Sequence, residues 1–251
     1  GGRGPGGFLG DENDLALGCV GAFPFAFYGF QLLGGWKRRV AAACGVFLVM
    51  AIVVSFSRGG FVGLACALLY CILTGSHKVR NLLLAAVSAV AFLLAVPSSY
   101  MKEIYSIGET DKGTADSRQF LWLTAFNIWQ AHPFFGIGGG NFNYVAGGHT
   151  PKGGRWDKPE YQERNWSGTT VHSTYFQILS EFGLLGILSF GAIAVGHLRG
   201  VSRIRRLAHR RRSLPKKLRD EIELYSGSLA AGMIGVLAAS AFLSAAFYPY
   251  V

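Results

Sequence analysis

The sequence has few charged residues for its length. Charged side chains make up 15% of the 251 residues, whereas a soluble domain carries about 25%. Hydrophobic residues make up 51% of the chain, and the mean hydropathy is +0.32. They occur in long blocks without charge, a pattern typical of membrane helices. The composition therefore indicates an integral membrane protein.

Patterns for metal and nucleophile chemistry are missing as well. No His, Cys and Asp cluster has the spacing of metal ligands, and there is no serine nucleophile elbow. All four cysteines lie in apolar blocks, which predicts buried small hydrophobic residues instead of a disulfide framework. The chain starts without Met or a signal-peptide pattern. We expect no cofactor and no metal, and we interpret the chain as a fragment that lacks upstream spans.

The apolar blocks predict an all-α membrane protein, a polytopic helical bundle of about six spans with a long, partly helical external loop. The block over residues 40–75 is too long for one span at about 1.5 Å per residue, and Ser57-Arg58-Gly59-Gly60 divides it. The expected spans are 14–35, 40–56, 61–75, 82–97, 174–196 and 226–247. They predict one integral membrane domain made of N-terminal helices (1–97), a large external loop (98–173), which the resemblance described below implies to be periplasmic, and C-terminal helices with a basic cytoplasmic loop (174–251).

The orientation follows from the Lys and Arg residues. The turns after the first and third spans and the long basic loop after the fifth carry most of the 24 basic residues, whereas region 98–173 carries seven basic and seven acidic residues. By the positive-inside rule, the basic turns are cytoplasmic and the long loop is external. Anionic lipid headgroups explain the net charge of +10 more simply than nucleic acid does.

The long loop has a helical part. Asp116 or Ser117 is expected to cap a helix that runs to about His132, where Pro133 ends it. Its predicted apolar stripe either lies at the membrane interface or packs on other spans, and consists of Trp122, Ala125, Phe126 and Trp129. Next, the glycine-rich run 134–142 predicts a flexible turn that lets the backbone approach other chain or ligand. Residues 146–170 lack periodicity, which predicts a mobile external loop.

Three residues are candidates for chemistry. Arg58 lies between two apolar helices at the external face, where its planar fork suits phosphate oxygens, although a structural salt bridge or snorkelling to headgroups also fits. Together with Arg118 it could bracket a diphosphate, but a solvated arginine is an equal alternative for Arg118. His172 can act as a base near neutral pH, or it is a hydrogen-bonded structural residue. Supporting candidates follow it along the chain: Tyr175, Gln177 and Glu181.

Five motifs follow one another along the chain. They are Ser57-Arg58-Gly59-Gly60, then Ser117-Arg118 with Trp122 and Ala125, then His132-Pro133-Phe134-Phe135-Gly136-Ile137-Gly138, then Val171-His172-Ser173-Thr174-Tyr175-Phe176-Gln177, and finally Glu181-Phe182-Gly183-Leu184-Leu185-Gly186. This ordered series resembles the shared domain of O-antigen ligases and O-antigen polymerases, which are polytopic bacterial glycosyltransferases of the inner membrane.

The resemblance implies transfer of a glycan from an undecaprenyl-diphosphate carrier to lipid A core or another glycan or protein hydroxyl at the periplasmic face. It implies that Arg58 and Arg118 hold the diphosphate, that His172 serves as the base near the acceptor hydroxyl, and that no metal is needed. The expected partners are the carrier-linked glycan, the acceptor and membrane lipids, with no nucleic acid. The expected location is the bacterial inner membrane, with several spans.

Two departures and three alternatives accompany this hypothesis. Ser173 stands where Asn is common in the family, and the family usually has more spans, so upstream helices are expected to be absent. A polymerase, which joins carrier-linked repeat units, is the alternative within the family. A transporter or flippase predicts ionisable residues near the middle of the spans. A non-catalytic scaffold would make the placement of the two arginines and the histidine coincidental.

Overall fold

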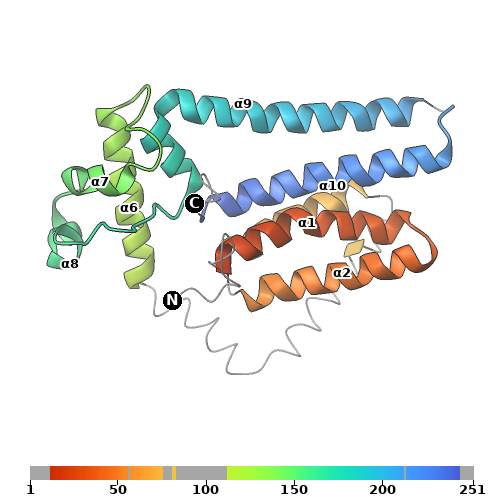
Figure 1. The fold of residues 1–251 in the computed structure, drawn as a ribbon, viewed down its shortest axis with the longest axis horizontal. Helices are drawn as coiled ribbons and strands as arrows, with labels where there is room; N and C mark the ends of the chain where they lie inside the picture. The colour runs from red at the N-terminus through yellow and green to blue at the C-terminus, as the bar shows by residue number, and fades with distance from the viewer. Residues whose placement is uncertain (1–11, 56, 76–80, 83–111, 212, 244–251) are drawn as a thin grey trace. The chain divides into compact units, whose positions relative to one another are not determined.

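The computed structural model of the chain describes residues 12–55, 57–75, 81–82, 112–211 and 213–243. Every element within them is a helix, so the expected all-α class is confirmed for the part of the chain that the structure describes (Figure 1). The chain divides into two compact units. We call them unit 1, which comprises 1–74, 173–175 and 187–251, and unit 2, which comprises 75–172 and 176–186.

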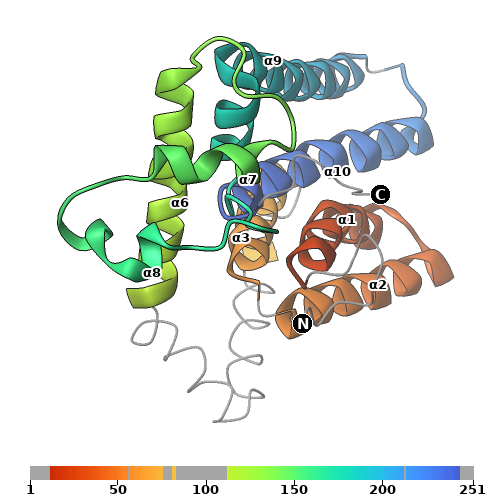
Figure 2. The same cartoon turned by 60° about the vertical axis from the view of Figure 1, so that its left-hand side comes forward.

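Unit 1 is a bundle of long helices. The helices α1, α2, α3 and α10 run side by side in both Figure 1 and Figure 2. The bundle contains α1 (Glu12–Leu32), α2 (Gly35–Val54), α3 (Arg58–Thr74), the second part of α9 (Thr174–Arg210) and α10 (Lys216–Ser240). Glycines bring their backbones together: a Cβ on Gly63 would lie 2.7 Å from the carbonyl oxygen of Gly235. Small residues at helix contacts are typical of packing within membranes.

Three described helices are long and apolar enough to cross a membrane, namely Asn13–Leu32, Thr174–Arg210 and Lys216–Ser240, and Arg58–Thr74 is a shorter apolar helix. The expected number of six spans is therefore not confirmed, and residues 83–97 of the fourth expected span lie outside the described residues. The expected division at residues 57–60 is confirmed. Ser57 Oγ accepts a hydrogen bond from the Gly60 N–H (3.1 Å) at the start of α3 and donates one to Asn13 Oδ1 (2.7 Å).

The segment expected to form the basic cytoplasmic loop after the fifth span is largely helical, and its cytoplasmic location stays a prediction. The helix α9 continues to Arg210 and α10 begins at Lys216, so only a short turn separates them. Arginine is a good helix former, and the extension is fixed by side-chain contacts. Arg205 pairs with Glu223 of α10 and donates to the carbonyl oxygen of Thr74 (2.8 Å), and His209 lies 3.2 Å from the same glutamate.

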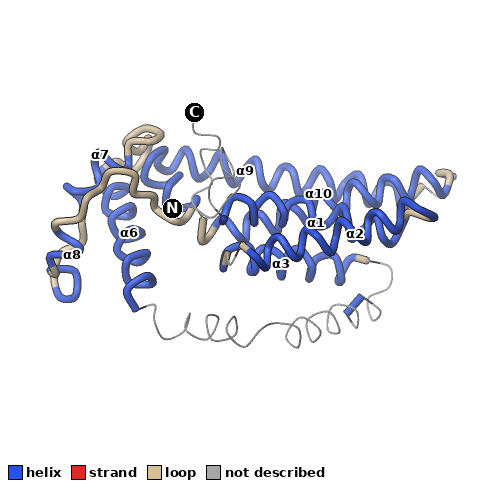
Figure 3. The backbone as a smooth tube through the Cα atoms, turned by 60° about the horizontal axis from the view of Figure 1, so that its bottom comes forward, coloured by secondary structure: helices blue, strands red, loops and turns tan. Residues whose placement is uncertain are grey.

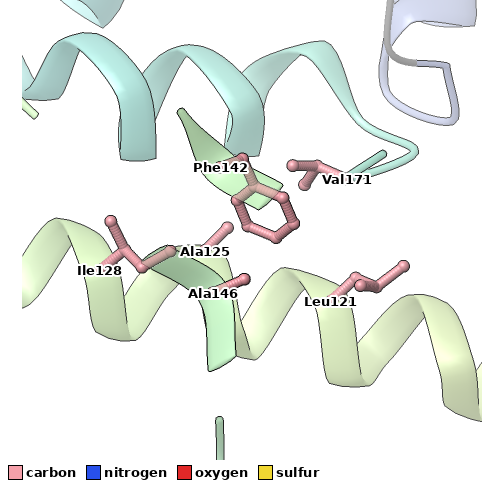
Figure 4. Packing of buried hydrophobic residues seen from close by; sticks show 6 residues of the cluster. All are labelled: Leu121, Ala125, Ile128, Phe142, Ala146 and Val171. Carbon is pink, nitrogen blue, oxygen red and sulfur yellow. The ribbon is translucent and has the colours of Figure 1, made fainter. Parts of the chain in front are cut away.

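Unit 2 packs short helices against one long helix. Its elements are α6 (Lys112–Ala131), α7 (Phe142–Val145), the 3₁₀ turns Ala146–His149 and Gly154–Asp157, α8 (Pro159–Gln162) and the first part of α9, and their course can be followed in Figure 3. Its core lies between α6, α7 and the residues before α9 (Figure 4) and consists of Leu121, Ala125, Ile128, Phe142, Ala146 and Val171.

Region 146–170, expected to be a loop without regular structure, is held by aromatic side chains. It contains both 3₁₀ turns and α8. Phe120 of α6 is fully buried, and its ring centroid lies 4.9 Å from that of Tyr161 and 5.6 Å from that of Trp156. Trp166 stacks on the same ring at 6.1 Å. The aromatic residues of this segment are its core, and their irregular spacing conceals that role because no helix or strand period connects them.

The helix α6 differs from the expected helix in two ways. It begins at Lys112, so Asp116 and Ser117 lie inside it and do not cap it. Asp116 instead accepts a hydrogen bond from Arg155, and Ser117 Oγ accepts one from Arg164 (3.0 Å). The buried face consists of Phe120, Leu121, Thr124, Ala125 and Ile128. Of the expected stripe, only Ala125 is fully buried, and Phe126 is 37% exposed. The expected end near Pro133 is confirmed.

Candidate functional site

The glycine-rich run pairs with a break in α9. Gly183 has non-helical angles (φ 64°, ψ −156°) inside this helix. The N–H groups of Ile137 and Gly138 donate to the carbonyl oxygens of Ser180 (3.1 Å) and Glu181 (2.8 Å). In return, Leu184 N–H donates to the carbonyl oxygen of Pro133 (2.8 Å), and Leu185 N–H donates to that of Phe134 (3.2 Å). Four backbone groups freed by the break are thus satisfied.

Two glycines make this exchange possible. A Cβ on Gly136 (φ 66°) would lie 2.4 Å from the carbonyl carbon of Glu181, and one on Gly183 would lie 2.5 Å from the carbonyl carbon of Phe134. Neither backbone can move away without losing its hydrogen bonds, so no other residue fits. The expected close approach of the glycine-rich run is therefore confirmed, and the segment it approaches is α9. A glycine inside an apolar helical pattern was the sequence signal for the break.

Glu181, which lies just before the break in α9, is buried and contacts the start of α7. Its side chain is 1% exposed, and Oε1 accepts a hydrogen bond from the N–H of Phe142 at the start of α7 (3.2 Å). Its Oε2 atom is buried without a hydrogen-bond partner among the described residues, as is Oε1 of Gln177 one turn earlier. Because a buried carboxylate is costly without partners, Glu181 is an unusual choice for a core position. Roles for Gln177 and Glu181 in catalysis stay predictions.

His172 has a strained backbone. Its φ is 56°, and it is the one non-glycine residue with positive φ in the described part of the chain. This conformation costs roughly 1–2 kcal/mol for most residues, although histidine is among those that adopt it more often. The side chain is half-buried, and Nε2 lies 3.4 Å from Thr170 Oγ1. Ser173, the residue after it, is the N-cap residue of α9. Strain of this kind clusters at functional sites.

Arg118 lies on α6 near the start of α9. Its side chain is half-buried, one turn before Trp122, whose ring stacks on Phe176 with centroids 5.5 Å apart and an angle of 12°. Val171, which precedes His172, lies at the Leu121 end of the core (Figure 4). Arg118 and His172 therefore lie at the same end of the contact between α6 and the start of α9, within unit 2. This arrangement was not evident from the sequence, where 53 residues separate them.

Arg58 is the first residue of α3, in unit 1, and is half-buried. The next residue, Gly59, packs on Leu243, whose carbonyl oxygen accepts the hydroxyl hydrogen of Thr174 at 2.7 Å. Tyr175 donates its hydroxyl hydrogen to the carbonyl oxygen of Leu237 at 2.7 Å. The starts of α3 and α9 thus meet the same end of α10. Thr174 was not among the expected site residues, and Tyr175 has a structural role here in addition to any supporting role.

No group of three or more His, Cys, Asp or Glu residues that could hold a metal ion occurs in the described part of the chain. Metal-independent chemistry stays a prediction. The candidate residues are one guanidinium group in unit 1 (Arg58), and one guanidinium group and one imidazole in unit 2 (Arg118 and His172). Such groups bind anions and transfer protons.

The fold and these residues define a helical membrane protein with two candidate cationic groups, on α3 and inside α6, and a candidate proton-accepting group just before α9. The family model described as O-Antigen ligase matches residues 43–191, more than half of the chain. No curated protein matches the sequence. The chain belongs to the O-antigen ligase family, as the resemblance predicted, and is a bacterial membrane protein. The matched range includes Arg58, Arg118 and His172.

Proposed function

We propose that this protein transfers a glycan from an undecaprenyl-diphosphate carrier to a hydroxyl acceptor, such as lipid A core, at the periplasmic face of the inner membrane. Family membership supports a reaction of the general O-antigen ligase or polymerase type, with a lipid-linked glycan and an acceptor as substrates. The observation that carries the specific proposal is the left-handed backbone of His172 at the start of α9, within the matched range.

In this proposal His172 is the base. The acceptor hydroxyl attacks the anomeric carbon of the carrier-linked glycan and loses its proton to the neutral imidazole. The bond between that carbon and the diphosphate oxygen breaks, and undecaprenyl diphosphate leaves with the bonding electron pair. The half-buried position of His172 supports this role, because the ring is reachable and yet held by its surroundings.

Arg58 and Arg118 bind the diphosphate and stabilise the negative charge that gathers on it. A guanidinium fork matches two phosphate oxygens and stays charged at every relevant pH. Fixed charges of this kind are most effective where water is excluded. The position of Arg58 supports an anionic ligand, because the N–H groups at the start of a helix add partial positive charge beside its guanidinium group.

Glu181 argues against the transporter alternative. It is the ionisable residue within the fifth expected span, and a transporter would use such a group near the middle of the membrane. Its Oε1 atom instead accepts the backbone N–H of Phe142. The polymerase alternative uses the same three residues and differs only in the acceptor.

Complementation tests this proposal and the choice of acceptor. The chain is expressed in bacteria that lack either the ligase or the polymerase, and the surface glycan is examined on gels. We expect restored attachment of long glycan to lipid A core in the first strain. Restored glycan length in the second strain alone would identify a polymerase.

Single substitutions test the proposed roles of the two arginines and the histidine. Arg58→Ala, Arg118→Ala and His172→Ala should each lower transfer by at least about 100-fold while the protein still inserts in the membrane. The matched control is Arg155→Ala, because Arg155 is an exposed arginine of unit 2 paired with Asp116, and it should keep transfer within about twofold. Wild-type transfer in all three variants would contradict the proposal.

A further inference from the structure

A groove that the transfer reaction does not use runs along unit 1 between α1, α2 and the start of α10. Its volume is about 660 Å³, within the range of about 300–1,000 Å³ for small-molecule sites. Small residues form its floor, among them Ala26 and Gly29 of α1 and Ala41 and Cys44 of α2. Larger apolar side chains, such as Phe25 and Leu48, form its walls. The hollow exists because the contact between α1 and α2 is made of small side chains.

The length of the groove matches one leaflet of a bilayer. Its lining runs from Ala22 on α1 to Leu33, the residue after this helix, and from Lys37 to Leu48 on α2. At about 1.5 Å per residue, each stretch is about 16 Å long. Half of a hydrocarbon core of about 30 Å is about 15 Å. A single acyl chain lying in the groove would therefore reach from the membrane surface to the middle of the membrane.

The two charged residues of the groove have opposite signs. Lys37 lies in the first turn of α2, and Glu221 lies near the start of α10. Both are at the end of α1, because α10 runs antiparallel to α1: Gly232 packs on Gly21, and Gly227 packs on Tyr28. Neither Lys37 nor Glu221 forms an ion pair with any described residue. One end of an apolar groove thus presents a cation and an anion that are both available to a ligand.

We propose that this groove binds an aminophospholipid, with one acyl chain along α1 and α2, the phosphate beside Lys37 and the ammonium group beside Glu221. Charge complementarity selects this occupant. A lipid with only negative charge, such as phosphatidylglycerol or a prenyl diphosphate, would place its charge beside the carboxylate of Glu221 and be repelled. The site is thus different in chemistry from the glycan carrier, and the inference does not rest on the proposed function.

Cys44 is a natural reporter of the groove. Its side chain is exposed and lines the hollow, whereas Cys19 and Cys71 are buried. In a Cys66→Ser background, Cys44 is the accessible thiol. The test measures the rate at which a maleimide labels Cys44 in the full chain, purified in lipid-free detergent micelles, after addition of phosphatidylethanolamine or phosphatidylglycerol. We expect phosphatidylethanolamine to slow labelling about tenfold near saturation and phosphatidylglycerol to change it less than about twofold.

Two variants and one matched control sharpen the test. Glu221→Gln should remove the difference between the two lipids, and Lys37→Gln should abolish protection by phosphatidylethanolamine. The control places the thiol elsewhere on α2, as Phe47→Cys in a Cys44→Ser background. Phe47 is 75% exposed and does not line the groove, so its labelling should be the same with both lipids.

Several outcomes would overturn the proposal. Equal protection of Cys44 by both lipids would mean that lipids only surround the helices without a specific site. Labelling of Cys44 that neither lipid slows would mean that the groove binds no lipid. Cys44 that stays unlabelled in lipid-free detergent would mean that a segment of the chain covers the groove, and oxidative crosslinking of Cys44 between two copies would mean that a second copy does.

Discussion

The two units of this protein are packed by opposite means. In unit 1, helix backbones touch directly: added Cβ atoms on Gly63 and Gly232 would lie 2.7 and 2.8 Å from the carbonyl oxygens of Gly235 and Gly21. In unit 2, large rings fill the core, with Phe120 in contact with Trp156, Tyr161 and Trp166. Between helices in lipid there is no hydrophobic gain, so close van der Waals contact must hold them together. Burial of large rings stabilises a fold that is surrounded by water.

The difference indicates that the two units have different roles. A bundle of close-packed helices such as unit 1 suits an anchor in the membrane. Unit 2, which is held together by aromatic rings and by backbone hydrogen bonds between distant segments, can have the irregular shape that a site for a glycan needs. Along the sequence, the candidate base His172 belongs to unit 2 and the next residue, Ser173, belongs to unit 1. His172 therefore lies where the sequence passes from one kind of packing to the other. Variants that disturb one unit and spare the other test this comparison.

Each unit has its own reporter. Four of the five tryptophans lie in unit 2, namely Trp122, Trp129, Trp156 and Trp166, so tryptophan fluorescence follows mainly that unit. Cys71, which is fully buried in unit 1, becomes reactive when that unit opens.

The largest effect is expected for Phe120→Ala. Removal of this fully buried ring leaves a cavity among three aromatic side chains and should destabilise unit 2 by about 3–5 kcal/mol. Thermal unfolding followed by tryptophan fluorescence should shift to lower temperature, while the reactivity of Cys71 stays unchanged. Phe135→Ala is the control, because Phe135 is 76% exposed. An equal loss in both variants would contradict the aromatic core.

A smaller effect is expected for Gly183→Ala. The added methyl would meet the backbone of Phe134 at 2.5 Å in a positive-φ conformation, and such strain should cost about 2–3 kcal/mol. Gly140→Ala is matched to it: φ is 76°, and no atom lies within 4 Å of the added Cβ, so about 1 kcal/mol is expected. The difference in unfolding temperature between the two variants measures how much the close backbone pairing between the glycine-rich run and α9 contributes to stability. Equal unfolding temperatures would contradict a role for this pairing.

The smallest effect of the three is expected in unit 1, for Gly63→Ala. The methyl would lie 2.7 Å from the carbonyl oxygen of Gly235, so α3 must shift away from α10, at a cost of about 1–2 kcal/mol. Gly18→Ala in α1 meets nothing within 4 Å and should stabilise the helix by about 0.5–1 kcal/mol. The rate of thiol labelling of Cys71 during heating measures the change in the stability of unit 1 in both variants. A lower stability in Gly18→Ala would contradict the contact pattern.

Much of the architecture could be predicted from the sequence. Apolar blocks gave the helices around residues 14–75 and the start of α9, and Pro133 marked the end of α6. The division at Ser57 was predictable because a polar Ser-Arg pair followed by two glycines ends one helix and begins another. These features depend on neighbours in the chain.

The rest depends on contacts between distant segments. The start of α6 could not be placed because Asp116 and Ser117 look like caps, and only Arg155 and Arg164 from far along the chain reveal their other partners. The order in region 146–170 depends on the buried ring of Phe120. For the site, residue types predicted Arg58, Arg118 and His172 as candidates. Only the fold revealed the strained backbone of His172. It also revealed that Arg118 and His172 lie at the same end of the contact between α6 and the start of α9.

The most direct test of the central claim is the rate of glycan transfer by His172→Asn. Asparagine tolerates positive φ about as well as histidine does, so the backbone and the unfolding temperature should stay the same. Loss of the base should lower transfer from an undecaprenyl-diphosphate donor by at least about 100-fold. Transfer at the wild-type rate by a stably folded His172→Asn protein would contradict the assignment of His172 as the base.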